Sequence, residues 1–208
     1  MREIVPYKTF NGALNALDNG GRFFNLFTKT DDQKVEASEI AKAAGVFSAD
    51  MRAFVFFEMA LMDLPPSMRK QLISHFSPDL MERYQTFRPL VVRPSLVEST
   101  GTAGKPAIVT GYPVFVEKKS QFRGFIIMVA PVIMLIPITD IFDVYEVFDS
   151  PDMSVPKTVI ATTRGSKRLD TIYSRFGGIL KELEFDDKTG KKHGLYLETL
   201  YYTPVISE

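Results

Sequence analysis

The pattern of the sequence changes at Arg88–Leu90, and this change limits the fold more than any other feature. Before it, apolar residues recur at helical spacing between glycine- and proline-based stops. After it, short runs rich in Val, Ile and Phe are separated by turn residues. A block of helices followed by a block of strands is typical of the α+β class. The sequence therefore predicts a helical domain over residues 1–88 and a β-rich domain over residues 90–208.

Helix start and stop signals divide the N-terminal half into short helices, which we expect to pack as a bundle. Ser48 and Ser77 are placed as N-caps, Gly45 as a stop, and Pro65–Pro66 as a break between two helices. After an opening pair of helices interrupted near residues 19–21, the expected helices cover residues 35–44, 49–64, 68–76 and 80–87.

The C-terminal half is expected to form an antiparallel barrel or sandwich with one late helix. The apolar spacing from Leu169 to Leu180 favours a short helix that ends at Gly177–Gly178. Two apolar runs around a polar turn containing Gly190 predict a terminal hairpin. The other expected strands cover residues 90–97, 107–117, 122–129, 132–138, 141–148 and 158–163. An OB-like barrel and a sandwich both stay open, and the barrel would bring nucleic-acid binding with it.

One segment, residues 38–53, has the spacing of a helix-turn-helix. Ala41, Gly45 and Met51 stand where that unit needs a small residue, a turn glycine and an apolar plug. The run Ser-Glu-Ile-Ala-Lys-Ala-Ala-Gly-Val resembles the opening of a lactose-repressor-type motif, and the resemblance implies DNA binding. The second helix argues against it, since Asp50 would be repelled by phosphates and only Arg52 offers a cation. The run that follows is apolar all round, so we expect it to be buried.

A second basic segment lies at residues 162–168. Its glycine could expose backbone amides, while Arg164, Lys167 and Arg168 supply charge suited to phosphate or a nucleic-acid backbone. The alternative is a solvated turn that leads into the late helix. Aromatic residues of an OB-like barrel could form a stacking platform, although core and edge positions are the favoured explanation for them; they are Tyr112, Phe115, Tyr196, Tyr201 and Tyr202.

Metal and cofactor sites are not predicted. The chain has no cysteine and only two histidines, His75 and His193, which excludes disulfides and thiolate sites. Residues 28–39 resemble a degenerate EF-hand loop, but Thr28 replaces its first aspartate and Gln33 its turn glycine. We therefore expect no bound metal and no cofactor.

The charge balance weakens the nucleic-acid interpretation. The 25 basic and 25 acidic residues cancel, and they also cancel within each half. No catalytic motif such as Gly-x-Ser-x-Gly or His-Glu-x-x-His is present, so an enzyme is not favoured. The sequence therefore predicts a non-enzymatic binding or regulatory protein that acts through protein–protein contacts or self-association. The alternative is a nucleic-acid-binding protein that uses residues 38–53 and 164–168.

The expected location is cytoplasmic, without a membrane span. The N-terminal residues have no apolar leader, and the lack of cysteine is compatible with the cytosol. The most apolar stretch, residues 124–139, is shorter than a spanning helix and is interrupted by Pro131 and Pro137. We interpret it as two buried strands.

Overall fold

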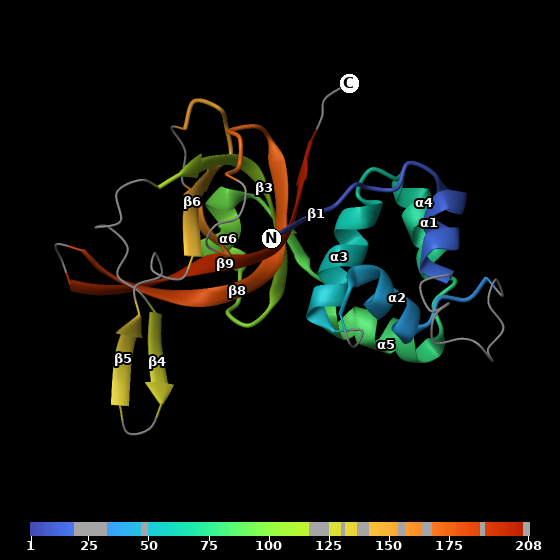
Figure 1. Cartoon of the computed structure of the whole chain (residues 1–208), viewed down its shortest axis with the longest axis horizontal. Coiled ribbons are helices and arrows are strands. Elements are labelled where there is room, and N and C mark those ends of the chain that lie inside the picture. Colours follow the sequence, from blue (N-terminus) through green and yellow to red (C-terminus); the bar gives the residue numbers. More distant parts are fainter. Residues whose placement is uncertain are drawn as a thin grey trace. The chain divides into compact units, whose positions relative to one another are not determined.

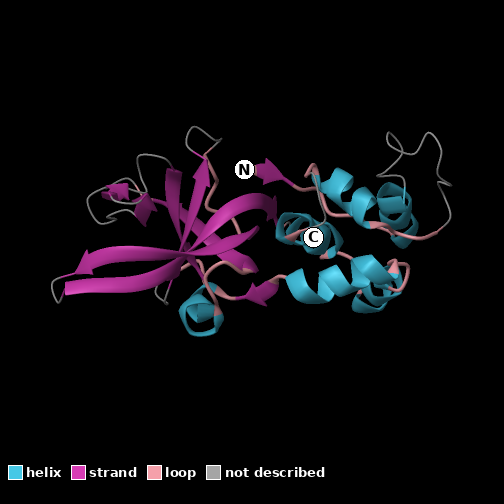
Figure 2. Ribbon diagram, turned by 90° about the horizontal axis from the view of Figure 1, so that it is seen from below, coloured by secondary structure: helices cyan, strands magenta, loops and turns pink. Residues whose placement is uncertain are grey.

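The chain forms two compact units. The computed structural model describes residues 1–18, 33–46, 50–116, 125–129, 132–136, 142–153, 157–163, 168–187 and 190–205. The helical unit comprises Glu3–Pro89, and the β unit comprises Leu90–Glu208 with Met1–Arg2. In Figure 2 most helices (cyan) gather in one unit and the strands (magenta) in the other. The described residues contain six α-helices and a mixed sheet of seven strands, which confirms the α+β class. The division into a helical domain over residues 1–88 and a β-rich domain over residues 90–208 stays a prediction.

The described residues of the helical unit form five α-helices. Figure 1 labels them, and the signals at several of their ends are those expected from the sequence. Gly45 ends α2 in the left-handed conformation with φ 75°. Ser77 caps α5, because its hydroxyl accepts the Leu80 N–H, and Pro78 follows at the first helical position. The helices are α1 (Phe10–Asp18), α2 (Ala37–Ala44), α3 (Met51–Leu61), α4 (Pro66–Ile73) and α5 (Pro78–Phe87).

The start of α3 differs from the expectation. Its N-cap is Asp50, whose carboxylate accepts the Arg52 backbone N–H at 2.9 Å, and the predicted cap Ser48 lies outside the described residues. An aspartate is favourable there because the first N–H groups of a helix lack partners and carry partial positive charge. From the sequence, Asp50 was expected to disfavour DNA binding. In the structure it caps the N-terminus of α3.

Helix α3 forms the core of the helical unit. All nine residues from Ala53 to Leu61 are buried, which confirms the expectation drawn from its all-round apolar sequence. The Tyr84 ring on α5 packs edge-on against Phe54 and Phe57 of α3, with centroids 5.6 and 5.8 Å apart. Phe76, just before α5, packs on the same tyrosine at 5.6 Å.

A carboxylate is enclosed in this aromatic core. The Tyr84 hydroxyl donates to Glu58 Oε1, and Arg88 Nε lies 3.3 Å from the same oxygen. Burial raises the pKa of Tyr84, and its hydrogen bond to Glu58 and the charge of that carboxylate raise it further. Because a buried carboxylate requires partners, these contacts tie α5 to the middle of α3.

The β unit contains the remaining strands and two short helical turns. Its first predicted strand, residues 90–97, ends early, since Pro94 opens a helical turn whose Ser95 N–H donates to the Asp149 carboxylate at 3.1 Å. The elements are β2 (Leu90–Val92), η1 (Pro94–Leu96), α6 (Val97–Thr100), β3 (Pro106–Phe115), β4 (Phe125–Val129), β5 (Val132–Ile136), β6 (Phe142–Phe148), β7 (Lys157–Thr163), β8 (Ser174–Asp187) and β9 (Gly190–Pro204), with β1 (Arg2–Glu3) paired to β9.

The predicted late helix is wrong. Residues 169–173 are not helical, and β8 begins at Ser174. Phe176 and Leu180 belong to the buried core of the sheet, whereas Ile172 is 48% exposed. A helical spacing of apolar residues therefore arose from a loop followed by a strand. The terminal hairpin is confirmed and longer than expected, because β8 and β9 pair from Ser174↔Pro204 to Asp187↔Gly190.

The sheet is mixed, which corrects the expected antiparallel architecture. Strand β3 pairs antiparallel with β8 and then with β6, and β6 pairs antiparallel with β7. Strand β9 pairs antiparallel with β8 but parallel with β7, and β2 pairs parallel with β3. Strands β4 and β5 pair only with each other among the described residues. No helix in the described part of the chain is long and apolar enough to cross a bilayer.

Gly111 lies where β3 changes partners. Residues Pro106–Gly111 pair with β8, and Tyr112–Phe115 pair with β6. A Cβ at Gly111 would lie 2.3 Å from the Phe148 carbonyl oxygen, so only glycine allows the two strands to approach this closely.

Replacing Gly111 by alanine should therefore lower the free energy of unfolding by about 3 kcal/mol, because backbone must move to admit the methyl group. The control is Gly104→Ala, where no atom lies within 4 Å of an added Cβ and only the φ of +79° is unfavourable, at about 1 kcal/mol. Urea unfolding followed by circular dichroism measures both. Equal losses in the two variants would contradict the close approach.

Replacing Tyr84 by phenylalanine keeps the ring but removes the hydroxyl that donates to Glu58. We expect a loss of about 2 kcal/mol, because the buried carboxylate loses a donor. Arg88→Gln should cost less than about 1 kcal/mol, since the Arg88 side chain is largely exposed. Urea unfolding ranks the two variants. A larger loss from Arg88→Gln would show that the arginine, and not the tyrosine, satisfies Glu58.

Candidate functional site

Strand β2 is an edge of the seven-stranded sheet. It stands at the end of the pairing order, and β3 is its only strand partner among the described residues. Leu90 and Val91 on this strand are 37% and 54% exposed. An exposed strand edge presents unpaired backbone groups and is a template for pairing with another chain. The β2 edge is therefore a candidate docking surface.

A groove of about 300 Å³ begins where β2 ends. Its walls come from β2 and Arg93, from the middle of β3, from the start of β8 and from the residue after β9. The lining residues are Val91, Val92, Arg93, Thr110, Tyr173, Arg175 and Val205. We refer to this set as the β2 groove.

Strand pairing assembles the far wall of the β2 groove. Thr110 and Arg175 are register partners between β3 and β8. Val205 is held beside Tyr173, because its N–H donates to the Tyr173 carbonyl at 2.8 Å. The Tyr173 ring in turn packs on Tyr112, with centroids 5.0 Å apart. The wall is therefore supported by hydrogen bonds and ring packing.

Arg93 is positioned by the turn that follows it. It precedes η1, whose Ser95 donates from its backbone N–H and its hydroxyl to the two oxygens of Asp149 at 3.1 and 2.5 Å. These bonds fix η1 to the end of β6. Arg93 itself is exposed, so its guanidinium can meet a ligand at the mouth of the groove.

The β2 groove is cationic and apolar. Within the described part of the chain, its lining includes two arginines and no carboxylate, together with three valines and a tyrosine. Guanidinium groups bind carboxylates and phosphates through paired N–H donors. The groove therefore suits a ligand that joins an apolar part to an anionic group.

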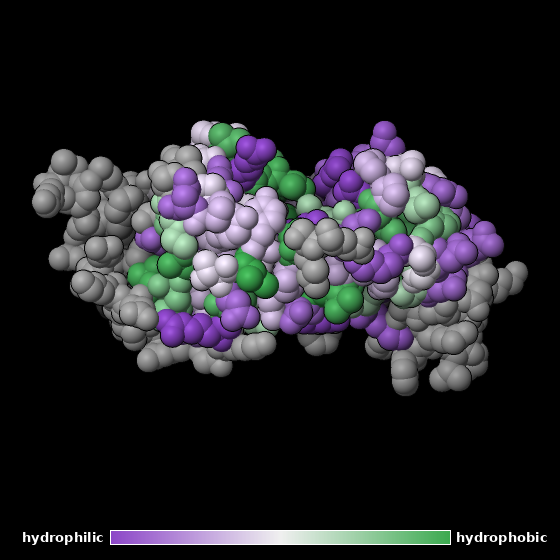
Figure 3. All heavy atoms as spheres, turned by 90° about the horizontal axis from the view of Figure 1, so that it is seen from above, coloured by the Kyte–Doolittle hydropathy of each residue, from purple (hydrophilic) through white to green (hydrophobic). Residues whose placement is uncertain are grey.

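On the face shown in Figure 3, each unit has small apolar areas (green) separated by polar residues (purple). Scattered apolar residues are ordinary on protein surfaces and identify no partner. A docking site must therefore be argued from residues that act together, as those of the β2 groove do.

The chain matches no family model, no curated protein and no solved structure. Its function must therefore be argued from the chemistry of its own residues.

The residues proposed for nucleic-acid binding belong to different units. Arg52 is exposed in the first turn of α3, in the helical unit, but the helix beyond it is buried from Ala53 onward. A recognition helix must present its residues to a DNA groove, and a buried helix does not. Arg164 and Lys167 lie outside the described residues. Contact of these residues with nucleic acid stays a prediction.

Arg168, in the β unit, is exposed and packs on aromatic residues. Its guanidinium carbon lies 4.2 Å from the centroid of the Phe115 ring, which packs edge-on against Tyr145 at 5.2 Å. The Leu169 N–H donates to the Tyr145 hydroxyl at 3.2 Å. Burial raises the pKa of Tyr145, although this hydrogen bond opposes the rise. These contacts hold the chain after residue 167 against β3 and β6.

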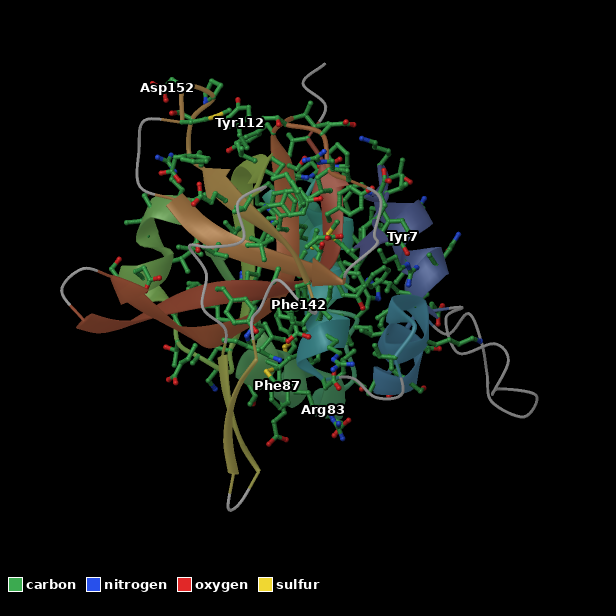
Figure 4. The ribbon with its side chains drawn as sticks, turned by 60° about the vertical axis from the view of Figure 1, so that its left-hand side comes forward. Tyr7, Arg83, Phe87, Tyr112, Phe142 and Asp152 are labelled. Carbon is green, nitrogen blue, oxygen red and sulfur yellow. The ribbon has the colours of Figure 1, made fainter. Side chains whose placement is uncertain are left out.

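The five aromatic residues of the proposed platform do not share one exposed face. Tyr196 and Tyr201 are buried, which favours the core interpretation for them. Tyr112 lies at the end of β6 that leads to the turn at Asp152, and Phe142 lies at the other end of that strand (Figure 4). Tyr112 instead supports the β2 groove through Tyr173.

A second cavity of about 280 Å³ lies in the helical unit, beside His75. His75 Nδ1 lies 2.6 Å from the Gln33 carbonyl oxygen, so this nitrogen carries a proton and donates. Glu39, the twelfth residue of the EF-hand-like loop, accepts the Glu36 N–H at 2.8 Å in a capping box. No group of three or more potential metal ligands occurs among the described residues. Thr28 lies outside them.

Sequence reasoning missed the β2 groove. Arg93 fell inside a predicted strand, and Tyr173 and Arg175 fell inside the predicted late helix. Val205 stood outside every predicted element. No local motif marks these positions, because register brings them together from segments more than 60 residues apart, as Thr110↔Arg175 shows. Only knowledge of the strand pairing could have identified the groove.

Proposed function

We propose that this chain is a non-enzymatic binding protein that holds a partner protein at the β2 groove. The observation that carries the proposal is an apolar edge strand that ends in a groove which, among the described residues, is lined by two arginines and no carboxylate. Edges of this kind bind other chains through backbone pairing, and the groove supplies selectivity.

The lining chemistry favours binding over catalysis. Acid–base or nucleophilic catalysis needs a positioned base beside a nucleophile or a second acid. The β2 groove contains arginines, a tyrosine and one threonine, and no histidine, cysteine or carboxylate. Arginine stays protonated in proteins and therefore does not act as the base.

The partner that fits is a protein segment with apolar and acidic residues. Its carboxylates would meet Arg93 and Arg175, and its apolar side chains would cover Val91 and Val205. The opposite charges of the groove and the acidic segment would also speed their association and would disfavour the binding of basic segments. We also propose the two-part design expected from the sequence, a bundle of α1–α5 and a β unit that binds.

A fluorescein-labelled peptide Thr-Val-Thr-Val-Asp-Asp should bind the full chain, as measured by fluorescence anisotropy at low salt. Its counterpart with Asn-Asn should bind about ten-fold more weakly, because the guanidinium groups lose their charged partners. Arg93→Gln and Arg175→Gln should each weaken the acidic peptide about ten-fold. The matched control is Lys105→Gln, which removes one exposed charge of the same unit outside the groove. Absence of binding, or equal loss with Lys105→Gln, would contradict the proposal.

The alternative function is nucleic-acid binding, and the strand order favours it. Five strands of the β unit can be numbered in chain order as 1 (β3), 2 (β6), 3 (β7), 4 (β8) and 5 (β9). Strand 1 pairs with 2, 2 with 3, 3 with 5, 5 with 4, and 4 with 1. Of these pairs, only that of strands 3 and 5 is parallel. We propose that the five strands form a closed OB-like barrel, a fold that binds oligonucleotides and oligosaccharides elsewhere. This is an argument by analogy of fold. Arg168 on Phe115 adds a cation beside an aromatic ring on the first of these strands.

Fluorescence anisotropy with a labelled 20-nucleotide single strand, titrated at several salt concentrations, tests the alternative. A binder should lose affinity steeply as salt rises, because cations on the protein release counterions from phosphate. The combined substitution Arg164→Gln, Lys167→Gln and Arg168→Gln should reduce that salt slope, and Arg52→Gln should do so if the helical unit takes part. The control is Arg83→Gln, an exposed arginine paired with Asp79 on α5. Absence of binding at low salt would remove the alternative.

A further inference from the structure

We infer that the partner's segment binds as an added β-strand on the free edge of β2 and carries an acidic side chain to Arg93 and Arg175. This inference rests on the proposed function and specifies how the β2 groove is occupied.

The backbone of β2 is open to pairing. The strand consists of Leu90, Val91 and Val92, and β3 pairs with one of its sides. Natural sheets protect their edges with charged residues, prolines or bulges within the edge strand. The residues of β2 are all apolar, and the prolines at positions 89 and 94 lie outside it. The strand is short, which is itself one protection that natural sheets use, but it carries no charge, proline or bulge along its length.

The side chains of β2 select what pairs with it. Val91 is 54% exposed and Val92 is buried, and both line the groove together with Arg93. A strand laid along this edge would place an apolar residue near Val91 and, one or two positions further, a residue beside Arg93. Because alternate residues of a strand share a face, an apolar–x–acidic pattern satisfies both positions.

The dimensions favour a strand over a helix. Three strand residues span roughly 10 Å, the length of a short added strand. An α-helix with its side chains is about 10–12 Å across and needs anchors over several turns. A groove of about 300 Å³ has room for one or two side chains of such a strand.

The charge of the groove argues against a second copy of the chain as occupant. In a symmetric dimer formed by two β2 edges, the same surface faces itself. Arg93 and Arg175 would then approach their own copies, and no carboxylate lines the groove to separate them. An acidic segment from a different protein would instead bring carboxylates to the two arginines.

Backbone methylation separates strand addition from other binding modes. The labelled peptide Thr-Val-Thr-Val-Asp-Asp is made in two forms, with N-methyl groups on its odd residues or on its even residues. In an added strand only one alternating set of N–H groups faces β2. One form should therefore lose at least about ten-fold in affinity, while the other form binds like the parent, as measured by anisotropy.

A substitution in the protein tests independently whether the peptide binds along β2. Val91→Gln should weaken the parent peptide about five-fold, because an apolar contact is lost. Ile172→Gln is the matched control, since Ile172 is 48% exposed in the same unit but does not line the groove. Circular dichroism checks that both variants stay folded.

The outcomes distinguish the two proposals. If both methylated forms bind like the parent while Arg93→Gln still weakens binding, strand addition is wrong and the groove still binds acidic segments. If Val91→Gln and Ile172→Gln weaken binding equally, β2 is not the docking edge. If the parent peptide does not bind, the proposed function itself fails.

Discussion

The close approach of β3 to β6 at Gly111 is the constraint on which the β unit depends. The absence of a Cβ lets β3 leave β8 and continue against β6, whose Phe148 carbonyl would collide with any side chain there. The parallel pairing of β2 stops at Val109, before this point. Among the described residues β2 is an edge strand of the sheet, and the β2 groove begins where this strand ends.

The two units stabilise their cores by different means. The helical unit surrounds one apolar helix, α3, and tolerates a carboxylate within it because Tyr84 and Arg88 both reach Glu58. The β unit has an inner cluster drawn from β2, β3, α6, β6, β7, β8 and β9. Its polar anchors, such as Asp149 on Ser95, stand at the ends of strands. These polar anchors therefore lie at strand ends, while the interior serves packing.

The features that could be predicted from the sequence are those that depend on interactions within a few residues. Ser77, Gly45 and Pro66 marked helix ends because capping and φ preference act within a few residues. It failed at the late helix, because residues four apart, such as Phe176 and Leu180, share one face of a strand as well as one face of a helix. The register shift lies at Gly177/Gly178, and a Cβ at Gly178 would lie 2.0 Å from the Glu198 carbonyl oxygen. That irregularity depends on β9, which local propensity does not include.

The candidate site was missed because neutrality of the whole chain does not imply neutrality of each surface. Equal numbers of acids and bases argued correctly against a uniformly basic protein. Strand register nevertheless brings Arg175 beside Thr110, and the end of β2 adds Arg93, without any carboxylate in the lining. Local charge follows from which strands pair, and composition does not record it. A chain with no net charge can therefore hold a groove that two arginines make locally cationic.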